Sequence, residues 1–225
     1  LSQREHQCRK CAPPLPYHYP ELTQHPCFPL PLTCGSCVFF KAWRRHAVPI
    51  EEGNVVLDPD TAHCELVVSD NGKSVTRGDP REDIPDTPNR FDVWRCLLGR
   101  DGFTSGRHYW EVEVEEDTGT WAVGVSREDG KRKGCFRFKP EEGLWAVEIQ
   151  GLFLIAFTSS DSTEFPEIQA PRRIRVSLDY EGGRVSFFSV DDETPISTFS
   201  QASFGGEKVY PWVWVDHGTC LKICP

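Results

Sequence analysis

Apolar and acidic side chains alternate strictly along the segment from Trp110 to Val114. In a pleated strand this spacing places Trp110, Val112 and Val114 on one face and the two intervening glutamates on the other. One face of the strand must therefore meet a core, while the other stays in water. This pattern favours an antiparallel sheet in a sandwich over a parallel sheet that is covered on both sides.

Short β-rich runs separated by turn residues continue from Asn54 towards the end of the chain, without a convincing helical window. Asn71-Gly72 and Gly182-Gly183 are typical of tight hairpin turns. The sequence therefore predicts an all-β fold. The predicted strands are Val55–Leu57, Glu65–Ser69, His108–Glu115, Thr120–Ser126, Leu144–Gln150, Phe153–Thr158, Arg173–Tyr180, Arg184–Val190 and Val209–Val215.

The first fifty residues differ in composition from the rest of the 225-residue chain. They hold eight of the 18 prolines, five of the ten cysteines, and six Lys or Arg residues against two acidic ones. The remainder has 19 basic and 32 acidic residues, which gives a net charge of about −13. We therefore expect a Pro/Cys-rich, largely irregular and disordered extension over residues 1–47 and a folded domain over residues 48–225.

The charge and hydropathy of the chain bear on its surroundings. The acidic balance of the folded part disfavours nucleic acid as a partner, because phosphate binding depends on clustered Lys and Arg. No apolar run reaches the roughly 18–20 residues that span a bilayer, so we expect no membrane segment in this chain.

The cysteines of the acidic part are spaced as free thiols rather than as a disulfide framework. Cys220 and Cys224 lie about 13 Å apart along one predicted strand, which is too far for a disulfide. Cys96 and Cys135 have no obvious partner near them in the sequence. Reduced, buried thiols are therefore expected, and they favour a cytoplasmic location.

Two CxxC pairs in the extension, Cys8 with Cys11 and Cys34 with Cys37, raise the question of zinc. Each pair offers two thiolates to one tetrahedral ion. The intervening segment is rich in proline and provides no hairpin to carry the ligands, so a disordered extension is favoured over a zinc site. We expect no cofactor.

Four motifs follow one another along the acidic part: Leu57-Asp58-Pro59, Arg90-Phe91-Asp92, the segment 106–114 and Leu178-Asp179-Tyr180-Glu181. Together they resemble the PRY-SPRY (B30.2) domain of tripartite-motif (TRIM) ubiquitin ligases and butyrophilins. The resemblance places PRY at about residues 50–105 and SPRY at about 106–225. It implies a bent antiparallel β-sandwich of the concanavalin-like jelly-roll type. The motif residues expected to form its scaffold are Leu57, Asp58, Pro59, Trp110, Glu111, Val112, Leu178, Asp179 and Tyr180.

The resemblance also implies a function. It suggests a non-catalytic module that binds a protein or peptide target, as the C-terminal domain of a TRIM-type ubiquitin ligase acting in ubiquitination or innate immune regulation. The chain begins at Leu1 and contains no methionine. We therefore expect it to be a fragment, with the ligase domains and any oligomerisation located upstream.

The alternative is a butyrophilin-like cytoplasmic domain that senses a small phosphorylated ligand. Such a domain would use a basic pocket, for which Arg107, His108, Arg132 and Lys133 fall in suitable stretches. Trp94, however, stands where that subgroup has a histidine.

Partner-binding residues of this family are expected on loops at one end of the sandwich. The segment Lys131–Phe138 interleaves basic with aromatic residues, which suits an acidic or C-terminal peptide. A solvated strand edge, protected by its charges from edge pairing, explains the same pattern. The candidate partner-binding residues are Arg77, Arg81, Trp94, Asp117, Arg132, Lys133, Phe136, Phe138, Phe153, Trp214, Asp216 and His217.

A remote enzymatic alternative rests on Glu111, Glu113 and Glu115, which alternate on one strand face about 6.6 Å apart. Retaining glycosidases with a sandwich fold use two carboxyl groups that lie roughly 5–5.5 Å apart. Surface glutamates on an outward face explain the pattern without chemistry, so a binding role is favoured.

Overall fold

The computed structural model describes residues 49–81, 83–117, 119–151, 153–158, 162–164 and 170–224, with the side chains of 116, 117 and 162–164 left aside. Residues Pro49–Pro225 form a compact unit of their own. The extension, with the possible zinc ligands Cys8, Cys11, Cys34 and Cys37, lies outside the described residues.

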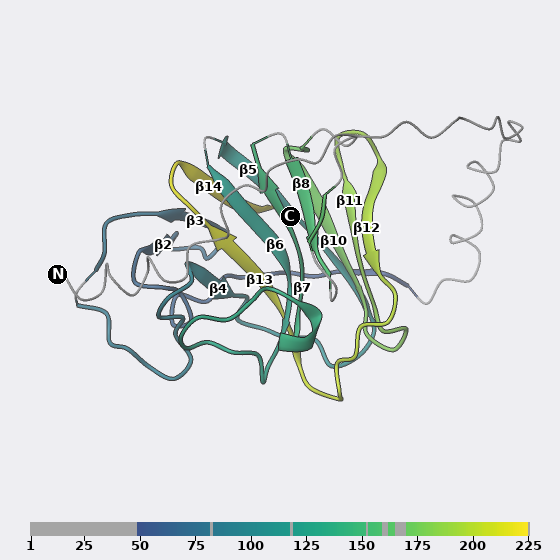
Figure 1. The fold of residues 1–225 in the computed structure, drawn as a ribbon, viewed down its shortest axis with the longest axis horizontal. Helices are drawn as coiled ribbons and strands as arrows, with labels where there is room; N and C mark the ends of the chain where they lie inside the picture. Colours follow the sequence, from purple (N-terminus) through teal and green to yellow (C-terminus); the bar gives the residue numbers. More distant parts are fainter. Residues whose placement is uncertain are drawn as a thin grey trace, which may run out of the picture. The chain divides into compact units, whose positions relative to one another are not determined.

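The first layer of the unit is a sheet in which seven strands follow the order β12-β11-β10-β5-β14-β3-β2 (Figure 1). The eighth strand, β1, pairs with β5. All of its pairings are antiparallel except the parallel pairing of β1 with β5. Its strands are β1 (Glu51–Glu52), β2 (Leu66–Val68), β3 (Ser74–Arg77), β5 (Arg107–Asp117), β10 (Arg173–Asp179), β11 (Arg184–Ser189), β12 (Thr194–Phe199) and β14 (Thr219–Cys224).

The second layer is an antiparallel six-stranded sheet with the order β4-β13-β6-β7-β8-β9. A short 3-10 helix, η2 (Pro140–Glu142), precedes β7. The strands are β4 (Cys96–Leu98), β6 (Thr120–Arg127), β7 (Leu144–Gln150), β8 (Phe153–Phe157), β9 (Ser162–Glu164) and β13 (Val209–Val215). The all-β antiparallel sandwich predicted from the sequence is thus confirmed.

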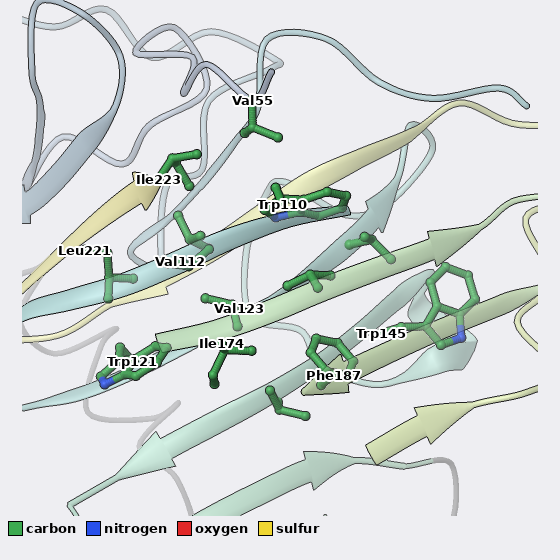
Figure 2. Close-up of a cluster of buried hydrophobic side chains, with 14 of the residues drawn as sticks. Val55, Trp110, Val112, Trp121, Val123, Trp145, Ile174, Phe187, Leu221 and Ile223 are labelled. Carbon is green, nitrogen blue, oxygen red and sulfur yellow. The ribbon is translucent and has the colours of Figure 1, made fainter. Parts of the chain in front are cut away.

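A single apolar core fills the space between the two sheets. Trp110, Val112 and Val114 of β5 are fully buried in it, as the alternating pattern predicts. Figure 2 shows Trp110 and Val112 in one cluster with residues of both sheets. The other labelled members are Val55, Trp121, Val123, Trp145, Ile174, Phe187, Leu221 and Ile223.

Both predicted tight turns, at Asn71-Gly72 and Gly182-Gly183, join antiparallel neighbours. Gly72 lies between β2 and β3 and has a φ of 64°, and Gly183 lies between β10 and β11 with a φ of 56°. Only glycine adopts this left-handed conformation at low cost. The predicted strand Val55–Leu57 is not a strand, because only Leu57 forms a bridge, with Gly99.

The scaffold motif residues mostly hold the two sheets in place. Leu57 and Leu178 are buried, whereas Pro59 is exposed. Asp58 accepts a hydrogen bond from the amide of Asp60 at 3.0 Å. The remaining polar members join neighbouring segments: Asp179 lies 3.4 Å from Arg107, and the hydroxyl of Tyr180 donates to the carbonyl of Glu207 at 2.7 Å.

Glu111 departs from its predicted place among the surface charges, because it is only 9 % exposed. Its carboxylate accepts hydrogen bonds from Nε and Nη2 of Arg175, at 3.0 and 2.6 Å, and lies 3.5 Å from Nε of Arg173. The prediction was wrong because the neighbouring strand β10 supplies two cations. A carboxylate can be buried at low cost only when it is paired in this way.

The cysteines also differ in part from expectation. Cys64, Cys96, Cys220 and Cys224 are reduced, and burial raises the pKa of Cys96 well above its ordinary value. Cys135, in contrast, is exposed and disulfide-bonded rather than buried and reduced.

The Glu111 pairing leads to a prediction for stability. Glu111→Gln should lower the free energy of unfolding by about 1–2 kcal/mol, because the buried position 111 then lacks the charge that pairs with Arg175 and Arg173. Glu113→Gln, on the same face of β5 but more exposed, should cost less than about 1 kcal/mol. Urea unfolding of both variants measures the difference. Equal losses would contradict the assignment of a structural role to Glu111.

Candidate functional site

The six-stranded sheet presents alternate residues to two sides. One side faces the core, and the other is here called the outer face. Strand register places its residues in rows that cross the strands. One row is named the Phe138 row after the residue that covers it, and it holds Leu98, Trp212, Gly124 and Ala146. The next is the Glu148 row, which holds Cys96, Trp214, Ala122, Glu148 and Ile155. Beyond the Glu148 row, Thr120, Gln150 and Phe153 form a rim.

The segment between β6 and β7, residues 128–143, covers the Phe138 row. The ring centroid of Phe138 lies 5.0 Å from that of Trp212 and 5.4 Å from that of Phe157. Gly124 and Ala146 lie on the strands between these two rings, and their small size leaves room for a third ring. The segment therefore supplies part of a second apolar cluster, which also includes Trp94 and Phe136.

Polar contacts fasten this segment to the loop that precedes β4. The indole of Trp94 donates to the carbonyl of Phe136 at 3.0 Å, and the amide of Gly134 donates to Asp92 at 2.8 Å. Lys133 forms an ion pair with Asp86. Internal contacts thus engage five side chains of this segment: Lys131, Arg132, Lys133, Phe136 and Phe138. Neither a peptide clamp nor a solvated edge includes these contacts.

Arg132 is the most enclosed base of the segment. Its guanidinium lies 5.4 Å from the ring centroid of Phe91, and burial lowers its pKa. Cation–π contact stabilises the charge in this place.

The other residues of the possible phosphate pocket have separate partners. Arg107 pairs with Asp179 at 3.4 Å, and His108 stacks on Phe103 with ring centroids 4.1 Å apart. Lys133 is engaged with Asp86. The described contacts therefore bring no two of these four residues together in one pocket.

Among the described residues, the side chains at the β8 end of the Glu148 row, here called its uncovered end, are partly accessible or exposed. Glu148 and Ile155 are partly buried, and the neighbouring rim residue Phe153 is 53 % exposed. Among the described residues, Phe153 and Val67 are the large apolar side chains that remain exposed, and Val67 lies on β2 in the other sheet. An exposed phenylalanine beside a partly buried carboxyl group marks this end of the face as a candidate contact surface.

Glu148 has an unusual electrostatic environment. Burial raises its pKa to about 7, and the negative charge of Asp216 adds to the effect. A carboxyl group whose pKa is shifted by burial and by a specific charge is a candidate functional residue.

Asp216 is held in place by a network that links the two sheets. Arg77 of β3 contacts Asp216 at 2.6 Å and Glu65 at 2.8 Å, and Arg95 contacts Glu65 at 2.7 Å. Burial opposes ionisation of Glu65, but the two arginines outweigh it and lower its pKa. The turn between β13 and β14, which also carries the exposed His217, is thereby fixed beside the rim.

The structure separates the predicted partner-binding residues into groups. One group belongs to the second apolar cluster or to the polar contacts that hold it in place: Trp94, Arg132, Lys133, Phe136, Phe138 and Trp214. Phe153, Asp216 and His217 lie near the rim, and Arg77 supports Asp216. Arg81 is exposed and pairs with Asp83, and the backbone of Asp117 ends β5 opposite Thr219.

Glu148 and Ile155 were missed by reasoning from the sequence. The alternation of β7 correctly assigns Glu148 to the outer face, but an outward glutamate on a strand is ordinarily solvated. Only the positions of Asp216 and of β8 show that this one is partly buried. Among the described residues, no group of three His, Cys, Asp or Glu side chains is arranged to hold a metal ion.

Comparison with known families accounts for this architecture. The SPRY domain family matches residues 107–225, and the PRY family, described as the SPRY-associated domain, matches residues 55–103. The chain belongs to the PRY-SPRY family. The resemblance carried by the four sequence motifs is therefore confirmed.

The PRY-SPRY domain has curated relatives of two kinds. Butyrophilin subfamily 1 member A1 of Bos taurus is 46 % identical over 187 residues, covering 81 % of this chain and 34 % of the relative. E3 ubiquitin-protein ligase TRIM11 of Bos taurus is 45 % identical over 154 residues, covering 68 % of this chain and 32 % of the relative. The chain thus spans about a third of the length of these relatives.

Solved structures agree with the fold. The TRIM65 PSpry domain has a TM-score of 0.67 at 23 % identity, over 88 % of this chain and all of that chain. Stonustoxin has a TM-score of 0.64 at 26 % identity, over 77 % of this chain and 27 % of that chain. In the described part of the PRY-SPRY chain, no helix is long and apolar enough to cross a membrane.

Phe138 offers a test of the internal role of the segment 128–143. Phe138→Ala should lower the free energy of unfolding by about 2–4 kcal/mol, because it empties the space between Trp212 and Phe157. Urea or thermal unfolding measures the loss. Phe153→Ala is the matched control and should cost less than about 1 kcal/mol, since that ring is exposed. A Phe138 variant as stable as this control would contradict the packing role.

Glu148 should make stability depend on pH. Its pKa of about 7 in the folded state lies above the ordinary 4.5, so the folded state holds more protons between these values. Stability should therefore fall as pH rises through this window, by about 3 kcal/mol in total. Glu148→Gln should remove the fall, so that the variant gains stability relative to the wild type near neutral and alkaline pH. Unfolding curves across the window measure this gain, which Phe153→Ser, a neighbouring neutral change, should not show.

Proposed function

We propose that this PRY-SPRY domain is a protein-recognition module that binds a partner segment on the uncovered end of its outer face. The observation that carries the proposal is Phe153, an exposed aromatic ring beside the partly buried Glu148 and Ile155. Exposed aromatic side chains of this kind are common binding anchors. The rigid sandwich beneath them supports a surface that need not reorganise on binding.

The proposal extends to the turn at Asp216 and His217, which adjoins the rim. Arg77 restrains Asp216 from the other sheet, so the turn adds a preorganised polar edge to the apolar Phe153. An apolar centre with a polar border is the usual composition of a recognition surface.

Binding rather than catalysis suits the glutamates of β5. Glu111 is engaged by Arg175, Glu113 lies 3.6 Å from Arg173, and Glu115 lies 3.1 Å from Lys222. Each of the three carboxylates thus lies beside a cation on a neighbouring strand, which favours a structural role over an acid/base pair.

The parent protein is the finer part of the proposal. We propose the substrate-binding domain of a TRIM-type ubiquitin ligase, supported by the identity with TRIM11, and a role in ubiquitination. A butyrophilin parent is the second candidate, favoured by the 46 % identity with butyrophilin subfamily 1 member A1. A RING and coiled coil in the full transcript would support the first parent, and an immunoglobulin ectodomain the second. A cytoplasmic location and a role in innate immunity stay predictions.

Partner capture tests the recognition face. The chain, its Phe153→Asp variant and its Val67→Asp variant are immobilised, and proteins retained from a cell extract are quantified by mass spectrometry. Val67 is the matched control, because it is the other exposed large apolar residue among those described and lies on the other sheet. We expect specific partners to be lost at least about tenfold with Phe153→Asp and kept with Val67→Asp. Equal capture by wild type and a folded Phe153→Asp variant would refute the assignment of this face.

A further inference from the structure

Glu148 stands apart from the other partly buried carboxylates of the described residues. Glu65 pairs with two arginines, Glu111 with Arg175, and Asp179 with Arg107. Asp58, Glu113, Glu142 and Asp216 likewise have a cation or a backbone N–H as partner. Glu148 has neither within the described part of the chain. A partly buried carboxylate without a partner lowers stability, so its place on a candidate binding face calls for a functional explanation.

The strands beside Glu148 bring no charge that compensates it. Its cross-strand neighbours are Ala122 on β6 and Ile155 on β8, and both are apolar. Beyond Ala122 lies Trp214, whose nine-tenths buried side chain carries an indole N–H without a partner among the described residues. The row therefore holds one acceptor and one donor whose hydrogen-bonding capacity is unused.

The charges near Glu148 favour an incoming cation. Asp216, at the end of β13, is the acidic group that acts on Glu148, and it is followed by the exposed His217. Arg77, the cation that contacts Asp216, is already shared between Asp216 and Glu65. A positive group from outside would thus meet two carboxylates in a partly desolvated place, where Coulomb attraction is stronger than in water. An anionic group would be repelled.

The apolar surroundings define which cation fits. Lys and Arg combine a charged end with a methylene stem that packs along apolar surface. Ile155 and the exposed ring of Phe153 provide such surface beside the carboxyl group. The net charge of about −13 on the acidic part of the chain adds a long-range attraction for a basic partner.

We propose that the outer face selects a partner segment that presents a lysine or arginine side chain to Glu148, with its stem against Ile155 and Phe153. The inference rests on the proposed function, since it names the chemistry of the segment bound there. It differs from the acidic or C-terminal peptide suggested by the basic segment Lys131–Phe138, whose side chains are engaged internally.

Selection from a displayed library of random peptides tests the inference. The full chain and its Glu148→Gln variant are used in parallel, with Glu113→Gln as control, because Glu113 is a more exposed glutamate on the other sheet. We expect peptides enriched in Lys or Arg with the wild type and with Glu113→Gln, and no such enrichment with Glu148→Gln. A selected peptide, synthesised with lysine or with norleucine at the enriched position, then gives the affinities.

The lysine peptide should bind at least about tenfold more tightly than the norleucine peptide, and Glu148→Gln should abolish the difference. The affinity of the wild-type chain for the lysine peptide should fall about tenfold between about pH 8 and about pH 6, because Glu148 must lose its proton to pair with the cation. The same measurement on Glu148→Gln isolates the contribution of Glu148, because only that contribution disappears in the variant.

The outcomes distinguish the inference from the function on which it rests. Peptides whose binding requires Phe153 but shows no preference for Lys or Arg would overturn the inference and leave the recognition face intact. Peptides that bind equally well to wild type and Phe153→Asp, or a failure to select any peptide, would overturn both.

Discussion

The packing of two twisted sheets through a shared apolar layer is the constraint on which the rest of this structure depends. Strand β5 is its centre, because it pairs with β10 and β14 along its length and with β1 at its start. The inward side chains of β5, Trp110 and Val112 among them, contact the layer formed by the other sheet. Burial of these side chains outweighs the entropy lost when strands distant in sequence are brought together.

The six-stranded sheet has apolar side chains on its outer face as well, and these also have to be covered. The segment 128–143 covers part of this outer face by placing Phe138 against Trp212 and Phe157. A sheet covered in this way becomes three layers deep over part of its width. At the β8 end of the Glu148 row, the exposed ring of Phe153 lies near the carboxyl group of Glu148, which has no cation or N–H partner among the described residues. The packing of the segment 128–143 and the proposed binding surface thus lie on different parts of one face.

Much of the fold follows from local patterns. Alternation in β5, β10 and β7 assigns their side chains to two faces, and Asn71-Gly72 and Gly182-Gly183 mark two hairpins correctly. Short strands such as β4 and β12 were not predicted, because they carry few alternating positions and Pro195 interrupts the second. They form because a neighbouring strand offers free hydrogen-bonding groups, as β13 does for β4. These groups are in position only in the assembled sheet, so a short window of sequence does not predict the strands that pair with them.

The sequence by itself determined the class of fold, the family and the inward faces of the long strands, because these depend on side-chain periodicity and on motifs that are local in the chain. Only the tertiary structure decided the fates of individual charged and aromatic residues. Glu111 and Glu148 both lie on strands with alternating side chains. The carboxylate of Glu111 pairs with Arg175, whereas Glu148 is subject to the negative charge of Asp216. Phe138 and Phe153 are equally apolar, yet one is packed beneath a loop and the other is exposed. The physical reason is that burial and electrostatic environment are set by neighbours across strands and loops, which no local pattern specifies.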